Sequence, residues 1–208
     1  SLNSGRYSGK EGGNLQILCA RLGVLLDWWQ KYNLIRETAM HDSLTGLLNH
    51  GSFIELFEQE LQRASRYDEK LILLMLDLDK FKRVNDTHGH LYGDYVLRDT
   101  SALLKSAVRN IDIVARYGGE EFAIILVKAG KRGTTESARR IVDAVAKHNF
   151  EKDGKTVKMT ISAGMAEYPS DGSGVRNLIA QADRAMYSVK RLGGNDVGSA
   201  NDNSTTIN

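Results

Sequence analysis

The segment Arg116-Tyr117-Gly118-Gly119-Glu120-Glu121-Phe122 joins two apolar runs, at about 112–117 and 121–127, that have the composition of β-strands. Adjacent glycines accept the positive φ values of a tight turn, so the segment predicts a β-hairpin with the glycine pair at its tip. Such a turn would hold Glu120 and Glu121 at an exposed edge of a sheet. Taken alone, an acidic glycine turn is more often a plain solvated hairpin than a binding site.

A second pair of carboxylates, Asp77 and Asp79, follows the apolar run 71–76. A continuous apolar run indicates a strand that is buried on both faces and therefore central in its sheet. If the end of this strand meets the glycine turn, the acids form a cluster suited to a hard divalent cation. The intervening stretch 81–94 is dense in cations that bind phosphate and in amide and carboxylate groups that can contact a base edge.

The composition bounds the class of protein. The chain has 208 residues, 41% of them hydrophobic, which suits one globular domain with an appendage. The formal net charge of +2 gives no strong field toward nucleic acid or a membrane. The single cysteine, Cys19, excludes an intramolecular disulfide and favours a reducing compartment. No apolar run approaches the ~18–20 residues of a membrane span, so we expect a cytoplasmic segment, although it could belong to a longer membrane-anchored protein.

The two ends of the chain differ from its middle. Residues 1–13 are rich in Ser and Gly, and we expect them to be disordered or derived from an expression vector. Residues 14–40 predict one long helix, which either packs on its own domain or pairs two chains in a parallel coiled coil. Residues 196–208 are polar and predict a disordered tail. The apolar stripe of the helix consists of Leu15, Leu18, Leu22, Leu25, Trp29 and Tyr32.

Residues 41–195 predict one α+β domain with helices over a mainly antiparallel sheet. A turn at 42–48 leads into a helix for which Ser52 is the expected N-cap. Further helices are expected at 91–108, 134–148 and 174–191, and strands at 71–78, 112–117, 121–127 and 156–167.

Four motifs in this part of the chain resemble, in order and spacing, those of the GGDEF family of diguanylate cyclases. The resemblance covers roughly residues 40–195 and implies a ferredoxin-like core similar to polymerase palms. The N-terminal helix also resembles, more loosely, the last helix of a GAF-type sensor domain. The motifs are Asp42–Asn49, Asp77–Asp94 with its Asn85-Asp86 and Gly93-Asp94 pairs, the signature Gly118–Phe122 in its GGEEF form, and Ala182–Lys190.

The resemblance implies condensation of two GTP molecules into cyclic di-GMP with loss of two pyrophosphates. It implies two Mg²⁺ ions per active site, with Mn²⁺ as an alternative, held by Asp77, Glu120 and the backbone carbonyl of Leu78. Glu121 would contact metal or orient the attacking ribose hydroxyl. The catalytic residues are thus Asp77, Glu120 and Glu121.

The same resemblance implies a set of contacts to GTP. Asn85 and Asp94 would read guanine, Lys82 and Lys190 would contact phosphates, and Gly118 and Gly119 would let the backbone approach them. Backbone N–H groups near Phe81 and Lys82 could add to the phosphate site. Without the ordered motifs, the lysines would be solvated surface charges and Asp94 a helix cap.

Two further features concern regulation. Asp112 lies six positions before Gly118, the spacing of the family's inhibitory product site, and Arg109 with Asp112 would grip cyclic di-GMP there. Arg140 could complete this site from a neighbouring domain. The alternative for Arg109 and Asp112 is a surface ion pair at the entry to a strand. Because each site holds one GTP, the resemblance implies a homodimer, which the helix at 14–40 could supply.

The match departs from the family pattern at the end of the domain. Gly194 stands where an arginine is expected to contact phosphate, and His50 replaces a common arginine. The segment after Asn195 lacks an apolar run, so the sheet edge should be short. Two alternatives therefore stay open: a catalytically weak module that binds GTP or cyclic di-GMP, and a mononucleotide cyclase or polymerase-like palm.

Overall fold

The computed structural model describes residues 19, 21–29, 31, 39–128 and 134–201, and it divides into two compact units, 1–40 and 41–208. In the first unit, residues 21–29 are helical. The predictions for residues 1–13 and for most of the helix at 14–40 lie outside the described residues. The second unit begins at His41, where the sequence placed the start of the domain.

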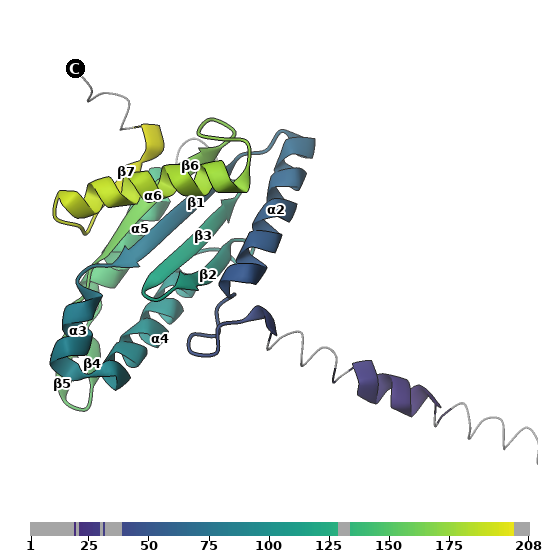
Figure 1. Ribbon diagram of the computed structural model, residues 1–208, viewed down its shortest axis with the longest axis horizontal. Helices are drawn as coiled ribbons and strands as arrows, with labels where there is room; N and C mark the ends of the chain where they lie inside the picture. Colours follow the sequence, from purple (N-terminus) through teal and green to yellow (C-terminus); the bar gives the residue numbers. More distant parts are fainter. Residues whose placement is uncertain (1–18, 20, 30, 32–38, 129–133, 202–208) are drawn as a thin grey trace, which may run out of the picture. The chain divides into compact units, whose positions relative to one another are not determined.

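The second unit is built on a five-stranded sheet in the order β2-β3-β1-β6-β7 (Figure 1). The predicted central strand, β1, is confirmed, and it pairs antiparallel with β3 and β6. β2 pairs antiparallel with β3, and only β7 runs parallel to its neighbour, β6. The bounds are β1 Leu71–Leu78, β2 Ile113–Gly118, β3 Glu121–Val127, β6 Ile161–Tyr168 and β7 Val197–Ser199.

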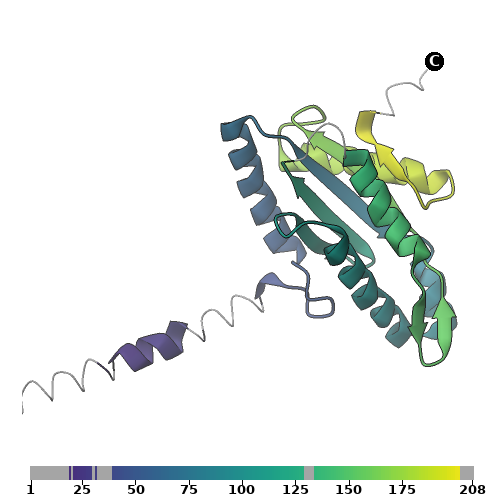
Figure 2. The same ribbon diagram turned by 180° about the vertical axis from the view of Figure 1, so that it is seen from behind.

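Helices cover both faces of the sheet, which explains the unbroken apolar run of β1 (Figures 1 and 2). Leu71, Leu73 and Met75 pack in one core with Phe53 and Phe57 of α2, while the alternate residues pack in a second core on the other face. Successive side chains of a strand point to opposite faces, so a strand between two hydrophobic cores carries apolar residues at every position. α2 (His50–Tyr67) and α6 (Val175–Arg191) cover the first face, and α3 (Phe81–His88), α4 (His90–Ala107) and α5 (Thr134–Lys147) contribute to the second.

The prediction of a single strand at 156–167 is wrong. The chain forms a separate hairpin, β4 (Phe150–Lys152) with β5 (Lys155–Val157), before β6 begins at Ile161. The hydroxyl of Tyr92 donates to the carbonyls of Phe150 (2.6 Å) and Lys155 (3.2 Å), which ties the hairpin to α4. Alternating hydrophobicity continues across the break, so the pattern alone did not reveal it.

Two predictions at helix and chain ends are also wrong. The N-cap of α2 is Asn49 and not Ser52, because the extended backbone of Asn49 lets its side chain accept from the Ser52 N–H (3.0 Å). The prediction of a disordered tail at 196–208 is wrong for residues 196–201, which are ordered, and its remainder, 202–208, lies outside the described residues. The backbone of residues 196–201 joins the sheet through the Ala163 N–H, which donates to the Asp196 carbonyl (2.9 Å), and Val197 packs on a core. The edge strand β7 is short, as expected.

Within the described ranges, no helix combines the length and the apolar character that crossing a bilayer requires.

Candidate active site

The two acidic segments meet at the end of β1. In the antiparallel register of β1 and β3, Asp77 lies opposite Glu121, and the Leu78 N–H donates to the Glu120 carbonyl (3.4 Å). The hairpin of β2 and β3 therefore carries the glutamates to the strand end that carries Asp77. The spatial convergence predicted from the sequence is confirmed.

The glycine turn differs in detail from the prediction. Only Gly119 has a positive φ, of 50°, whereas Gly118 remains in β2, paired with Glu121. The register shifts between Arg116 and Gly118, which marks an irregularity of the kind that turns a strand end. The expectation that both glycines take a left-handed backbone is therefore wrong.

Asp77 is buried and its two oxygens have different surroundings. Oδ2 lies 2.5 Å from Nζ of Lys190 on α6. Oδ1 is buried and receives no hydrogen bond from any residue that the structure describes. A buried carboxylate oxygen without a partner is costly, and a bound cation would satisfy it.

The donor set fits a cation that keeps open positions for other ligands. Across the described ranges, no group of three or more acidic, histidine or cysteine side chains could hold a metal ion alone. Asp77 and Glu120 with a backbone carbonyl match the usual coordination of Mg²⁺, which binds one or two carboxylates and completes its coordination shell with phosphate oxygens and water.

The electrostatics of the site show an excess of negative charge. Burial is the main cause that raises the pKa of Glu121, and the neighbouring charges of Asp77 and Asp183 raise it further. Burial also raises the pKa of Asp183, on α6, and that of Tyr117, whose pKa rises further beside Asp183 and Glu121. Asp183 lies in the motif Ala182–Lys190, but the sequence gave no sign that its charge acts on Glu121 and Tyr117.

The residues predicted to read guanine lie together where α3 meets α4. The amide oxygen of Asn85 packs so closely on Gly93 that a Cβ at that position would lie 1.9 Å from it. Asp94 follows Gly93 directly. Lys82 is exposed on the first turn of α3, whose N-cap residue, Lys80, makes no side-chain capping bond. Phe81 is buried in the core.

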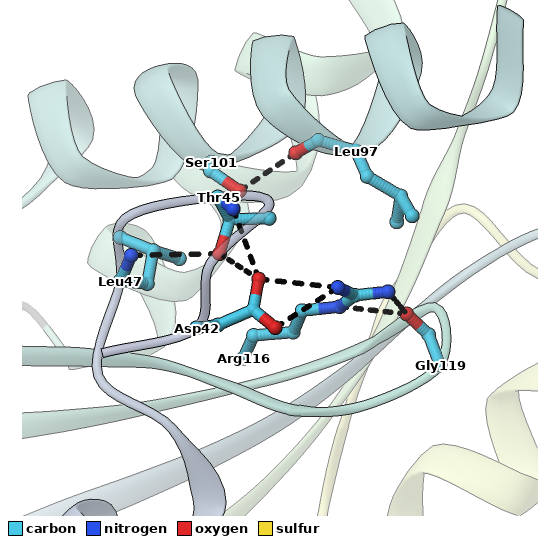
Figure 3. A network of polar contacts seen from close by, with 7 residues as sticks. All are labelled: Asp42, Thr45, Leu47, Leu97, Ser101, Arg116 and Gly119. Carbon is cyan, nitrogen blue, oxygen red and sulfur yellow. Dashed lines mark hydrogen bonds and ion pairs between the residues drawn. The ribbon is translucent and has the colours of Figure 1, made fainter. Parts of the chain in front are cut away.

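Arg116 holds the glycine turn from the other side (Figure 3). Its Nε and Nη2 donate to the Gly119 carbonyl at 3.0 and 2.8 Å, and its Nη1 lies 3.1 Å from both carboxylate oxygens of Asp42. Its own backbone N–H donates to the Leu48 carbonyl (2.9 Å). One side chain thus connects the residue before Glu120 to the loop that opens the domain.

That opening loop is built to present Asp42 as an anion. The hydroxyl and N–H of Thr45 donate to Asp42 Oδ1 at 2.7 and 2.9 Å. Burial, the largest influence, opposes ionisation of Asp42, but the hydrogen bonds from Thr45 and Arg116 together outweigh it and lower its pKa. The sequence had identified this loop as a motif without giving it a role.

The sequence profile described as "Diguanylate cyclase, GGDEF domain" matches residues 39–196. The chain belongs to this family. Diguanylate cyclase A of Treponema denticola is 37% identical over 77% of this chain and 44% of its own length. Cyclic di-GMP phosphodiesterase NbdA of Pseudomonas aeruginosa is 36% identical over 78% of this chain and 21% of its own length.

A solved structure agrees with the fold of this GGDEF domain. The coiled coil and GGDEF domain of DgcB from Caulobacter crescentus, in complex with c-di-GMP, superposes with a TM-score of 0.80 at 27% identity, covering 89% of this chain and 98% of that one. The fold is α+β and palm-like, as predicted. The family in general uses a divalent metal cofactor. The chain spans less than half the length of the two curated relatives, one of which is named as a phosphodiesterase. The relatives' names alone therefore do not decide the reaction, which the site residues of this chain must support.

The arginine and aspartate predicted to bind product are paired with each other in this GGDEF domain. Arg109 Nη2 lies 3.0 Å from Asp112 Oδ1 and also donates to the Val127 carbonyl (2.7 Å). The Asp112 side chain is only 2% exposed. Arg140 lies close by, since its Nη2 reaches the Ala107 carbonyl (3.5 Å) at the end of α4. The structure pairs Arg109 with Asp112 and places the Arg140 guanidinium at the end of α4, and the role of the three residues as a product site stays a prediction.

Asp79 does not share the role expected of the acidic pair. Its carboxylate accepts hydrogen bonds from Thr160, Ser162 and the backbone of Asn195. The interpretation that Asp77 and Asp79 both face a cation is therefore wrong for Asp79, whose oxygens are already occupied by donors from the protein.

Proposed function

We propose that this GGDEF domain is a Mg²⁺-dependent diguanylate cyclase that condenses two GTP molecules into cyclic di-GMP and two pyrophosphates, and that it does so in the cytoplasm. The observation that carries the proposal is the meeting of Asp77 with Glu120 and Glu121, with one oxygen of Asp77 buried and unpaired. The names of the relatives support the same reaction class.

Asp77, Glu120 and the Leu78 carbonyl would hold the divalent cations, two per site. When bound, the cations would neutralise phosphate charge and lower the pKa of the attacking hydroxyl. The ribose 3′-oxygen of one GTP forms a bond to the α-phosphorus of the other, and the bond from that phosphorus to pyrophosphate breaks. Glu121, whose pKa is raised by burial, would contact the metal or orient the attacking hydroxyl.

The rest of the site would orient GTP. We assign guanine recognition to Asn85 and Asp94, because a carboxylate accepts from guanine N1–H and N2–H, which adenine does not offer in that arrangement. Lys82 and the uncapped start of α3 near Phe81 would bind phosphates. Lys190, now paired with Asp77, would turn its ammonium toward the triphosphate when cations take its place.

Two active sites must face each other to close the ring, so we propose a homodimer. In the first unit, Leu22, Leu25 and Trp29 follow heptad spacing and are 51–65% exposed in the single chain. Leu15, Leu18 and Tyr32 of the predicted stripe lie outside the described residues. A parallel coiled coil would bury the stripe and raise the effective concentration of one site for the other.

We further propose that Arg109 and Asp112 form an inhibitory product site, which Arg140 of a neighbouring domain would complete. A cavity of about 370 Å³ lies beside the Arg109–Asp112 pair and is also lined by Lys105 and Asn110. Exchange of the Asp112 partner for a guanine or phosphate group would free the planar guanidinium for bidentate contacts.

Incubation of the chain with GTP and MgCl₂, followed by chromatography of the products, tests the proposal. We expect cyclic di-GMP and pyrophosphate, with a specific activity that rises with protein concentration. Glu120→Gln should lower turnover by at least about 10³-fold with the fold preserved, because it removes a charged ligand from the metal site.

Glu55→Gln, an exposed glutamate on α2, is the matched control and should leave turnover unchanged. GTP binding without any product would favour the weak binding module, for which the glycine at position 194 is the specific ground. A cyclic mononucleotide as sole product would favour the other alternative, and full activity of Glu120→Gln would refute the metal-ligand role.

A further inference from the structure

The carboxylate of Asp79, just beyond the end of β1, collects three hydrogen bonds from segments far away in the chain. Oδ2 accepts from the Thr160 hydroxyl (2.7 Å) and from the Asn195 N–H (3.0 Å), and Oδ1 accepts from the Ser162 hydroxyl (2.6 Å). The Asp79 N–H in turn donates to the Thr160 carbonyl (2.9 Å). Asp79 therefore joins three segments: the end of β1, the start of β6 and the loop after α6.

These donors are neutral and partly enclosed, and Ser162 is fully buried. A carboxylate can accept all three bonds at once, whereas an asparagine offers only one acceptor oxygen and would present its amide group to one of the donors. The three bonds as they stand, all accepted by Asp79, therefore require a carboxylate at this position.

The loop after α6 is tied to the helix turn that carries Lys190. The Gly193 N–H donates to the Lys190 carbonyl (3.2 Å), and the Gly194 N–H donates to the Val189 carbonyl (3.1 Å). Because Asn195 follows immediately, the bond from its N–H to Asp79 fixes the end of α6 relative to β1. The side chain of Lys190 then reaches Asp77 on the same strand.

Gly194 belongs to the same arrangement. Its φ is +78°, and a Cβ at this position would lie 2.7–2.8 Å from the atoms of the Asp79 carboxylate. A side chain here would be strained and would push against Asp79. The glycine at position 194 is thus matched to the close approach of Asp79.

We propose that Asp79 is a positioning residue that fixes Lys190 for binding the triphosphate. The proposal rests on the proposed function, since it concerns the same GTP site. Asp79 does not touch the substrate; it acts by anchoring the loop 193–195 and with it the last turn of α6.

The test is a double-mutant cycle between Asp79→Asn and Lys190→Met in the full chain. The readout is the dissociation constant of a GTP analogue with a methylene bridge between the α- and β-phosphates, measured by calorimetry with MgCl₂, together with kcat and KM for GTP. We expect Asp79→Asn to weaken analogue binding about tenfold and to raise KM more than it lowers kcat, as for the loss of one charge-assisted contact. In the Lys190→Met background the same change should have almost no further effect.

A second readout needs no nucleotide. Asp79→Asn should speed hydrogen exchange of the Asn195 amide, because that N–H loses its carboxylate acceptor. If Asp79→Asn proves unstable, Thr160→Val serves in its place, because it removes one donor to Asp79 but keeps the carboxylate. It should speed hydrogen exchange of the Asn195 amide by a smaller factor.

Asp99→Asn is the matched control, because Asp99 also accepts from two side chains, His148 (2.7 Å) and Tyr95 (3.0 Å), but contacts neither Lys190 nor the loop 193–195 in the described contacts. It should leave analogue binding unchanged. Equal losses from Asp79→Asn with and without Lys190, or wild-type affinity and exchange in Asp79→Asn, would overturn the proposal while leaving the proposed function intact. A wild-type chain that binds no analogue would overturn both, whatever the exchange data show.

Discussion

Two carboxylates, Asp42 and Asp79, anchor the two sides of the candidate active site in different ways. Asp42 holds the glycine turn through the guanidinium of Arg116, which lies between the Asp42 carboxylate and the Gly119 carbonyl. Asp79 holds the loop after α6 directly, by accepting from neutral donors. The first connection depends on an ion pair between two segments, whereas the second depends on a single carboxylate with enough acceptor positions.

Loss of the Arg116 connection and loss of the Asp79 connection should therefore affect different parts of the site. The Arg116 connection ends on the peptide before Glu120, so it should set the position of a metal ligand and hence the rate of the chemical step. The Asp79 connection ends on the turn that carries Lys190, so it should set the affinity for phosphates. The site is thus held by two separate supports, and each can be removed without the other.

Arg116→Ala should have the largest effect on this comparison. Without the guanidinium, the Gly119 carbonyl loses both donors and Asp42 is left without its cation, so we expect kcat to fall about 100-fold, as misplacement of a reacting group by about 1 Å can produce. KM for GTP should change little. Arg116→Lys should restore only part of the rate, because an ammonium cannot bridge both partners in the same plane. Initial rates over a range of GTP concentrations measure both quantities.

Arg63→Ala is the control, since Arg63 is also paired with acids, Glu60 and Glu69, but on α2 and away from the turn. It should keep the wild-type kcat. A rise in KM with unchanged kcat in Arg116→Ala would contradict the division between the two supports.

Arg109→Ala should act on regulation and not on the turn. The Arg109–Asp112 pair resembles the Asp42–Arg116 pair in chemistry, but its further contact is to Val127 and not to the glycine turn. We expect the concentration of cyclic di-GMP that halves the rate to rise about tenfold, since a bidentate charged contact is lost. The initial rate should stay close to that of the wild type. Identical inhibition curves for the two proteins would argue against the product site.

Much of this architecture could be predicted because it follows from the pattern of apolar residues and glycines within short segments of the sequence. The continuous apolar run of β1 required two covered faces, and the apolar runs around the glycine pair required a hairpin. The hairpin turn holds Glu121 at the start of β3, and the antiparallel pairing of β1 with β3 places Asp77 opposite it. Asn85 and Asp94 were predicted together, and the structure packs Asn85 of α3 against Gly93, the residue before Asp94 on α4.

What could not be predicted depends on partners that are distant in the sequence. Asp79 was taken with Asp77 as one acidic pair, because nothing near it shows that donors at 160, 162 and 195 would fill its oxygens. Arg116 likewise reads as one residue of a strand until Asp42, 74 positions earlier, is seen beside it. The ordering of residues 196–201 came from pairing with β6, and its polar composition concealed that pairing.

The smallest expected effect concerns the dependence of stability on pH. Asp42 has a lowered pKa in the folded chain, so its carboxylate stabilises the fold fully above its ordinary pKa, and the contribution is lost as the pH falls through the lowered value. Asp42→Asn should therefore lower Tm at pH 7 by about 2–4 °C, which corresponds to about 1 kcal/mol. The difference from the wild type should shrink as the pH falls below about 4. Thermal unfolding between pH 3 and about pH 8, followed by circular dichroism, measures it.

Asp183, on α6, provides the opposite case. Burial raises its pKa, so ionisation costs the folded state free energy, and this cost is complete only when the pH exceeds the raised value. Asp183→Asn should raise Tm at neutral pH and lose this advantage in acid, the reverse of Asp42→Asn. The two variants remove the same charge from the same chain, so net charge cannot explain opposite signs. Equal shifts in one direction would mean that the Asp42 network adds nothing beyond overall charge, and the Arg116 support would then lack an energetic basis.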